Sequence, residues 1–235
     1  MSSQPSVAVI AALPREIRGM IGRMTPDAGL LKQGIHLYRI ESAIVVAGGM
    51  GAGRASVAFQ AAKATMKIGQ VISVGLAGAC DAALQAGVIV EADLVVDART
   101  GERFKCFAQD GDRPGAVLVT TDAIAGVQEK ARLRAAYGAA IVDMEAATLA
   151  RLAQAHGLGF RAIKGISDAH DFELASLARF AGAHGHFRTA AFAMHTAVRP
   201  HHWRHAAKLG RDSNKALATL HKRLQAILRE IGSLA

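Results

Sequence analysis

The chain has 235 residues, 51% of them apolar, which is enough to bury a substantial core in one large or two small domains. Its two cysteines, Cys80 and Cys106, lie outside any C-x-x-C motif, which excludes a disulfide framework and a zinc ligand set. No uncharged apolar run reaches the roughly 18 residues of a membrane-spanning helix, and the first residues lack the pattern of a secretory signal. We therefore expect one α/β domain in the cytoplasm.

The formal net charge of +9 is concentrated toward the carboxyl end. Residues 199–235 hold eight Lys or Arg and two acidic residues, and so carry +6. We expect a single domain, residues 1–235, with a nearly balanced core, residues 7–198, and a basic helical extension, residues 199–235. Such an extension can meet nucleic acid, anionic lipid headgroups or only water.

The first predicted element is a strand that leads directly into a helix. Residues 7–13 form a continuous apolar run, typical of a strand buried on both faces, and Pro14 then opens a helix. Glu16 lies in the first turn of that helix, just past the carboxyl end of the strand.

A glycine-rich turn follows two further predicted strands. Residues 35–40 alternate as a half-exposed strand does, and residues 43–47 form a second apolar run. The turn, residues 48–53, leads into a helix through Lys67. It can present backbone N–H groups to an anion, or it can serve only close backbone packing. As a dinucleotide fingerprint it is weak, because it does not follow the first strand and no acidic residue ends the next one.

The middle of the chain reads as short strands separated by turns. Small residues at 75–79 indicate a turn after the first of these strands, and Asp122 is expected to cap a helix that reaches about Tyr137. The predicted strands are residues 71–74, 87–90, 92–96 and 117–119.

Between residues 139 and 170, acidic residues follow the ends of two apolar segments. The run 139–142 breaks into Asp143-Met144-Glu145 before a helix over residues 146–156, and a second run, residues 160–166, ends in Ser167-Asp168. Ligands of open α/β sheets bind beyond the carboxyl ends of strands. For Asp168, a turn-forming role and a site role are equally supported by spacing alone.

Helical phase separates Asp143 from Glu145. With Asp143 as N-cap, Glu145 lies on the same side of the helix as Leu149 and Leu152, the stripe that faces the core. Asp143 is therefore read mainly as a helix cap, whereas Glu145 points inward and is favoured for a site role.

Beyond Asp168 the pattern is helical. Helices are expected over residues 173–181, 187–198 and 211–231. His201 and His205 have the spacing of metal ligands on a helix, but no acidic residue accompanies them, so we assign no metal.

Four groups of residues, taken together, resemble the nucleoside phosphorylase and nucleosidase superfamily, over most of residues 7–171. The order and spacing of these groups are most similar to those of the methylthioadenosine/S-adenosylhomocysteine nucleosidases. The groups are residues 7–13 with Glu16, Gly75-Leu76-Ala77-Gly78 with residues 87–90, Val142-Asp143-Met144-Glu145-Ala146, and Ile166-Ser167-Asp168.

The resemblance implies a three-layer α/β/α sandwich whose mixed central sheet curls toward a barrel, in a chain that forms at least a dimer. It implies that Asp168 protonates the leaving purine at N7, that Glu145 holds the ribose hydroxyls with Met144 against the sugar, and that Glu16 orients the attacking water. The implied catalytic residues are thus Asp168 and Glu16. The implied substrate-binding residues are Glu145, Met144, Asp143, Val142, Ser167, Leu76, Ala77, Gly78 and Lys164.

These roles agree with the chemistry of the bond. A purine leaves poorly as an anion, so a proton donor at the base contributes on the order of 10²–10⁴ in rate. A carboxylate near the sugar stabilises the positive charge that develops there. No cofactor is implied, and phosphate stays open as a co-substrate.

Several positions depart from the nucleosidase pattern. Leu76 stands where those enzymes place a serine, and Lys164 where they place an arginine, which leaves the placement of the nucleophile open. Phosphorylases of the superfamily carry an arginine at the position of Ser73, and the possible phosphate partners that remain here are Arg15, Arg18, Arg54 and Lys164. A carboxylate at Glu16 would repel a phosphate dianion, which favours water or a differently bound phosphate.

The carboxyl region resembles that of hopanoid-biosynthesis phosphorylases, which remove adenine from adenosylhopane. The resemblance rests on Gly185-His186-Phe187-Arg188, Val198-Arg199-Pro200 and residues 208–213 with Ala216-Leu217. A lipid-linked substrate would give the basic extension a role, because Lys or Arg near anionic headgroups contribute about 1 kcal/mol each. We therefore expect a cytoplasmic homodimer, with the extension in peripheral contact with the inner membrane.

Three hypotheses follow. The first is an enzyme that releases adenine from a 5′-substituted adenosine such as adenosylhopane, by hydrolysis or phosphorolysis. The second keeps this chemistry with methylthioadenosine or S-adenosylhomocysteine as substrate. The third is a non-catalytic purine-nucleoside binding module whose basic extension binds nucleic acid.

Overall fold

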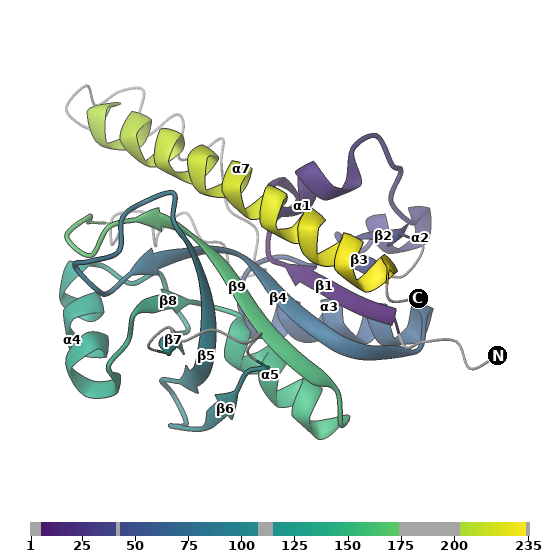
Figure 1. The fold of residues 1–235 in the computed structure, drawn as a ribbon, viewed down its shortest axis with the longest axis horizontal. Coiled ribbons are helices and arrows are strands. Elements are labelled where there is room, and N and C mark those ends of the chain that lie inside the picture. The colour runs from purple at the N-terminus through teal and green to yellow at the C-terminus, as the bar shows by residue number, and fades with distance from the viewer. Residues whose placement is uncertain (1–5, 41–42, 108–114, 174–202, 234–235) are drawn as a thin grey trace.

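The structure is a computed structural model that describes residues 6–40, 43–107, 115–173 and 203–233. These residues form a mixed sheet with helices on both faces (Figure 1), the α/β sandwich that the sequence predicts. The strands are β1 (Ser6–Ala11), β2 (His36–Ile40), β3 (Ala43–Ala47), β4 (Ile68–Ala79), β5 (Ile89–Asp97), β6 (Arg103–Lys105), β7 (Ala116–Thr120), β8 (Ile141–Asp143) and β9 (Gly159–Asp168).

The sheet runs in the order β2-β3-β1-β4-β8-β7-β5-β6, and β9 pairs with both β4 and β5. Strands β4, β8, β7, β5 and β9 therefore close on one another as a ring, which is the predicted curl toward a barrel. Strands β1, β4 and β9 are parallel, so their carboxyl ends meet on one side.

Helices cover the two faces of the sheet separately. In Figure 1, α3 and α5 lie on one face, and α1 and α7 lie on the other. The helices are α1 (Pro14–Ile21), α2 (Ala28–Leu31), α3 (Ala52–Thr65), α4 (Val127–Tyr137), α5 (Ala146–Ala155) and α7 (Trp203–Ser233).

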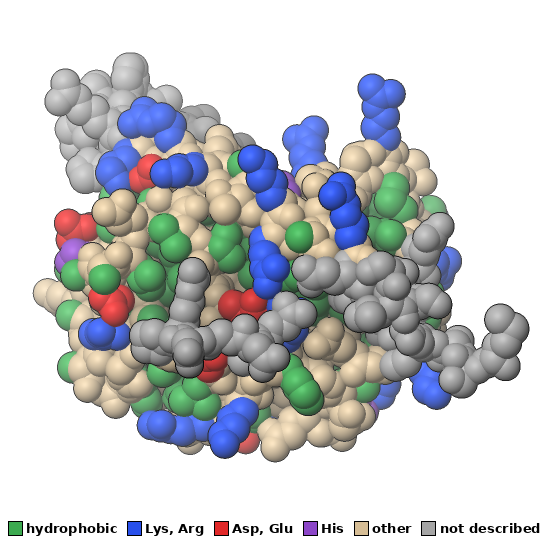
Figure 2. Space-filling view, in the orientation of Figure 1, with side chains coloured by type: hydrophobic (Ala, Val, Ile, Leu, Met, Phe, Trp, Pro, Cys, Tyr) green, Lys and Arg blue, Asp and Glu red, His purple; other side chains and the backbone are tan. Residues whose placement is uncertain are grey.

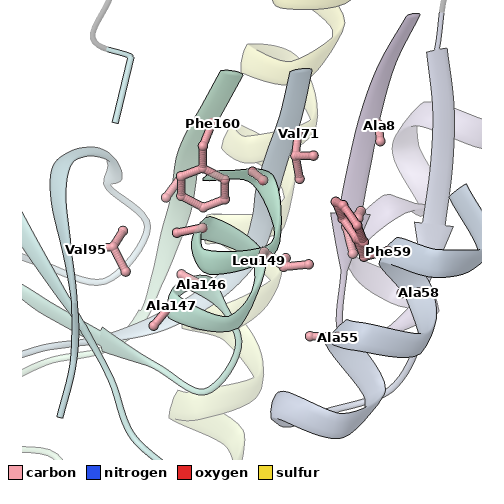
Figure 3. Close-up of a cluster of buried hydrophobic side chains, with 14 of the residues drawn as sticks. Ala8, Ala55, Ala58, Phe59, Val71, Val95, Ala146, Ala147, Leu149 and Phe160 are labelled. Atoms are coloured by element: carbon pink, nitrogen blue, oxygen red, sulfur yellow. The ribbon is translucent and has the colours of Figure 1, made fainter. Parts of the chain in front are cut away.

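Strand alternation in β1 supplies side chains to apolar cores on both faces of the sheet. Ala8 and Ile10 of β1 point to the core that holds Phe59 of α3 (Figure 3), whereas Val7 and Val9 point to the core beneath α1 and α7. Since successive side chains of a strand face opposite sides, a continuous apolar run is what a sheet covered on both faces requires. This is why the apolar run could be read as a strand from sequence, although β1 ends at Ala11 and Leu13 is already the N-cap of α1.

Helix α7 is longer than the helix predicted over residues 211–231. Its buried stripe, which includes Leu217, Leu220 and Leu224, packs on β9 and α1. The ring of His221 lies against Gly19 of α1, where an added Cβ would come within 2.3 Å of it, and its Nε2–H donates to the Glu16 carbonyl oxygen at 2.8 Å. The carboxyl-terminal helix therefore holds α1 in place.

Three local predictions are wrong. The small residues 75–79 do not form a turn but continue β4, which stays paired with β9 as far as Gly78. The two strands predicted over residues 87–90 and 92–96 are the single strand β5. Helix α4 begins at Val127 with Gly126 as N-cap, so Asp122 does not cap it.

The structure does not describe residues 174–202. The helices predicted over residues 173–181 and 187–198 therefore lie outside the described residues, except for Glu173, and so does His201. Among the described residues, none of the helices combines the length and the apolar character that spanning a bilayer requires.

Candidate active site

A cavity of about 280 Å³ opens where the carboxyl ends of β1, β4 and β9 meet, beside the end of β8. Its size is close to the lower limit for small-molecule sites. Ten of the eleven residues that the sequence marked for the site line it: Asp168, Glu16, Glu145, Met144, Asp143, Val142, Ser167, Leu76, Ala77 and Gly78. Carboxylates that are distant in the sequence therefore share one cavity.

Glu16 is held by backbone N–H groups. Its Oε2 accepts hydrogen bonds from the amides of Ala12 at 3.0 Å and Leu13 at 2.8 Å, and its Oε1 accepts one from the amide of Leu76 at 3.1 Å. The side chain is buried. Backbone amides are rigid donors, so this carboxylate keeps one orientation toward the cavity.

Glu145 begins α5 as its N-cap residue and faces the cavity half-buried. Its Oε1 accepts a hydrogen bond from the amide of Gly51 at 2.6 Å, so the anion that the glycine-rich turn receives is a carboxylate of the chain itself. Burial, followed by the Asp143 carboxylate, raises the pKa of Glu145 to about 7 against the opposing effects of Lys164 and the Gly51 amide.

Asp143 combines a capping role with an ion pair. Its oxygens accept the amide N–H of Ala146 at 3.0 and 3.3 Å, and its Oδ1 accepts the Thr120 hydroxyl at 2.7 Å. Its Oδ2 lies 2.9 Å from Nζ of Lys164. The prediction that Asp143 is the N-cap of this helix is wrong, because α5 begins at Ala146 with Glu145 as its N-cap, although the Asp143 side chain does accept the first helical amide.

Lys164 does not line the cavity, contrary to the expectation from the resemblance. Its side chain is buried behind the acidic wall of the cavity, which consists of the carboxylates of Glu16, Asp143, Glu145 and Asp168. There, Nζ also donates to the Ser73 hydroxyl at 3.0 Å. Burial lowers the pKa of Lys164, but the carboxylates of Asp143 and Glu145 outweigh it and raise the pKa overall. Lys164 therefore acts as a buried counter-ion to the acidic wall and does not contact the cavity.

Asp168 ends β9 and is almost fully buried at the other end of the acidic wall. Its Oδ1 accepts the Ser167 hydroxyl and its Oδ2 accepts Nζ of Lys130, each at 2.5 Å. Burial is the largest influence and raises the pKa of Asp168, although Lys130 and Ser167 act in the opposite direction. A raised pKa is what a proton donor at neutral pH requires.

Two glycines of β4 allow these carboxylates to come close. Gly75 has φ of 133°, and a Cβ there would lie 3.0 Å from the Glu16 carboxylate. At Gly78 a Cβ would lie 2.9 Å from Oδ2 of Asp168. The glycines that sequence reading assigned to a turn are thus needed within the strand, because the acidic side chains pack on bare backbone.

Sequence reading missed several lining residues. Lys130 carries the clearest signal that was available, since it lies three residues from both Val127 and Leu133 and thus on the apolar stripe of α4. Met50 and the loop residues that precede α4 had no distinguishing pattern, whereas Arg15, which also lines the cavity, was considered only as a phosphate partner. From α7, Leu209, Gly210 and Ser213 also line the cavity.

Metal ligands do not gather in the described part of the chain, where no group of three or more His, Cys, Asp or Glu side chains is placed to hold an ion. The acidic residues of the cavity are instead bound to amides, hydroxyls and lysines.

Comparison with known proteins relates part of the sequence, and the fold as a whole, to proteins of known structure. Residues 112–199 match the family model described as the phosphorylase superfamily. No curated protein matches the chain. Many solved structures do match, and several of them cover nearly the whole chain.

Three of these structures represent the set. The 5′-methylthioadenosine nucleosidase of Arabidopsis thaliana is 14% identical, with a TM-score of 0.70 over 97% of this chain and 96% of its own. The 5′-methylthioadenosine/S-adenosylhomocysteine nucleosidase of Neisseria meningitidis is 19% identical, with a TM-score of 0.69 over 97% and 100%. Futalosine hydrolase of Helicobacter pylori is 14% identical, with a TM-score of 0.68 over 96% and 98%.

The chain has the fold of these nucleosidases. The match to the phosphorylase superfamily over residues 112–199 includes β8, α5 and β9, the elements that carry Glu145 and Asp168. The sequence resemblance and the whole-chain structural likeness therefore agree on the fold.

Proposed function

We propose that the protein cleaves the N-glycosidic bond of a 5′-substituted adenosine and releases adenine. The observation that carries this proposal is the convergence of Glu16, Glu145 and Asp168 on one cavity of nucleosidase fold. Each carboxylate is held by different partners, which suits three different tasks at one bond.

The proposed reaction divides these tasks along the substrate. Asp168 donates its proton to N7 of the purine, so that the electron pair of the breaking C1′–N9 bond leaves with a neutral base. Glu145 accepts the ribose hydroxyls and stabilises the positive charge that develops on the sugar. Glu16, fixed by three amides, orients a water molecule for attack on C1′.

Water is the proposed nucleophile because the described part of the cavity offers little to a phosphate dianion. The lining cations of the described residues are Arg15, which is exposed at the opening, and Lys130, which is bound to Asp168. The fixed carboxylate of Glu16 would repel a second anion.

For the 5′ substituent we propose a large apolar group such as that of adenosylhopane, which would place the protein in hopanoid biosynthesis. The support is the resemblance of the carboxyl region to hopanoid-biosynthesis phosphorylases, together with the mainly apolar lining to which Leu209 and Leu76 contribute. The alternative substrates are methylthioadenosine and S-adenosylhomocysteine, which the names of the structural neighbours favour.

We also propose a homodimer that meets an anionic membrane surface from the cytoplasmic side. Figure 2 shows Lys and Arg side chains gathered over the face that α7 and α1 cover. Exposed basic residues of α7 include Lys208, Arg211, Lys215, Lys222 and Arg229. Salt-sensitive flotation with anionic but not zwitterionic vesicles would support this contact, and its absence would remove it.

The experiment for the function is chromatographic detection of adenine from a panel of 5′-substituted adenosines, with and without phosphate. Hydrolysis predicts adenine and free sugar without phosphate, whereas phosphorolysis predicts a sugar 1-phosphate that requires it. Binding of these nucleosides without turnover would replace the proposal with a non-catalytic binding module. Comparing adenosylhopane with methylthioadenosine decides the substituent.

A further inference from the structure

Lys130 is a buried cation at the cavity for which the proposed reaction has no role so far. It projects from α4 toward the end of β9, is 1% exposed and lines the cavity next to Asp168. The other charged side chains of α4 do not share this position, since Glu129, Arg132 and Arg134 are all partly or largely exposed.

The surroundings of Lys130 match the donors of an ammonium group. Its Nζ donates to Oδ2 of Asp168 at 2.5 Å, to the Ala169 carbonyl oxygen at 2.8 Å and to the Phe172 carbonyl oxygen at 3.2 Å. A protonated lysine has three N–H donors and no acceptor, so the three oxygens satisfy it completely. Burial of a charge without such partners would be strongly unfavourable.

The pair has little freedom to move. At Gly78, an added Cβ would lie 3.1 Å from Cε of Lys130 and 2.9 Å from Oδ2 of Asp168, so both side chains pack on bare backbone. Ser167 holds the other carboxylate oxygen. The orientation of Asp168 toward the cavity is therefore set by a cation on one oxygen and a hydroxyl on the other.

Other groups that face the pair are few among the described residues. Lys208 of α7 exerts a weaker electrostatic influence on Asp168. The thiol of Cys80 lies near both charges, and burial raises its pKa to about 12, so it stays neutral. Lys130 is thus the cation in direct contact with Asp168.

We propose that Lys130 is a positioning residue that aims the proton of Asp168 at the departing base and stabilises the carboxylate left after transfer. This role rests on the proposed function. In the step, the O–H bond of Asp168 breaks and the N7–H bond of the purine forms, while the electron pair of C1′–N9 leaves with the base. Asp168 ends as an anion paired with Lys130 and later takes a proton from water.

Burial and Lys130 act on Asp168 at different stages. Burial favours the neutral carboxylic acid before transfer, which keeps the proton available. The ammonium favours the anion as it forms, and a charge that is already oriented requires no rearrangement at that moment. A buried acid without Lys130 would hold its proton but release it poorly.

The test compares two leaving groups in Lys130→Met, which keeps the length of the side chain and removes the charge. Adenine release should fall by about 10²-fold or more, as on loss of a preorganised transition-state contact. Release of p-nitrophenolate from the matching 5′-substituted riboside should change less than threefold, because this leaving group needs no proton. The alkaline limb of the adenine-release profile should move to higher pH, since Asp168 loses its cation.

Two further variants serve as controls. Lys130→Arg keeps the charge, so its alkaline limb should stay near that of the wild type even if its rate falls. This variant also keeps the test possible if Lys130→Met does not fold. Arg132→Met removes an exposed cation from the same helix and should leave both leaving groups unaffected. In a background of Asp168→Asn, adding Lys130→Met should cost little more, because the two residues act as a unit.

Equal losses with both leaving groups, or an unmoved alkaline limb, would show that Lys130 only supports the fold and would overturn the inference. The inference would also be overturned if Lys130→Arg moved the alkaline limb as far as loss of the cation in Lys130→Met does. Failure of the proposed function looks different, since the wild type would then release no adenine from any nucleoside.

Discussion

Glu16 and Asp168 are both buried carboxylates of one cavity, yet they are held in opposite ways. Glu16 is bound by three backbone amides, and among the described contacts no cation touches it. Asp168 is bound by a lysine and a hydroxyl, with burial as the main influence on its pKa. Backbone amides fix the orientation of a carboxylate that accepts their hydrogen bonds. Burial opposed by a neighbouring cation instead sets the pKa at which a carboxyl group releases its proton.

This contrast indicates how one acidic wall can act on both sides of a bond. A carboxylate that only accepts suits the water side, and one that keeps a proton suits the base side. Glu145 lies between these extremes, bound by the Gly51 amide and with its pKa raised to about 7 by burial.

The largest expected effect is that of Asp168→Asn. An amide cannot donate the acid proton, so adenine release should fall by on the order of 10²–10⁴-fold. Steady-state assay of adenine measures this, and unchanged melting behaviour shows that the fold persists. A variant that retained more than a tenth of wild-type adenine release would remove Asp168 from the role of proton donor.

Glu16→Gln should reduce the rate by on the order of 10²-fold, because its amide nitrogen would face backbone N–H donors and misplace the attacking water. Unlike the loss at Asp168, this loss should be the same for adenine and p-nitrophenolate as leaving groups. Rescue of Glu16→Gln by the activated leaving group would contradict the division of tasks.

Glu145→Gln should lower kcat/KM about tenfold at pH 8, as expected from loss of one charged contact to the sugar. In the wild type, kcat/KM should rise through pH 7 as Glu145 ionises, and the variant should lack that limb. A pH profile of kcat/KM tests this, and a limb retained in the variant would assign it to another group.

Glu145 also links pH to stability. Its pKa is raised in the folded chain from 4.5 to about 7, so the folded state holds this proton more tightly than the unfolded state. The free energy of unfolding should therefore decrease from about pH 4.5 to pH 7, and Glu145→Gln should reduce this dependence. Denaturant unfolding across that range measures it, and parallel curves for the two proteins would contradict the assignment.

The smallest expected effect is that of Gly75→Ala, which should cost about 1–3 kcal/mol of stability through its backbone conformation. Its Cβ would also crowd the Glu16 carboxylate at 3.0 Å, so activity should fall as well. Gly101→Ala is the matched control, since φ there is 76° and nothing lies within 4 Å of the added Cβ. Equal activity in the two variants would show that Gly75 does not shape the site.

The same contrast explains what sequence could predict. The continuous apolar runs of β1 and β9 predict strands that are covered on both faces, so the layers could be placed. Glu145 does line the cavity, but it does so as the N-cap of α5 and not as a residue of the helix, so helical phase was not the reason. The small residues 75–79 were misread because glycine signals a turn locally, whereas here it admits side chains distant in sequence. No local pattern reveals that kind of close approach.

The lysines were misjudged for a related reason. Lys164 was expected in the cavity because its family position suggested a phosphate or water contact, but the neighbouring Asp143 binds it behind the wall. Lys130 went unremarked, although its place on the apolar stripe of α4 marked it as buried. A buried lysine needs acceptors, and those acceptors lie about forty residues further along the chain.

The most direct measurement is isotopic analysis of the products in phosphate-free ¹⁸O-labelled water with 5′-methylthioadenosine and adenosylhopane as substrates. The account predicts free adenine together with a sugar that carries one ¹⁸O at C1′, formed by the wild type and almost absent with Asp168→Asn. No adenine from either nucleoside, with or without added phosphate, would contradict it.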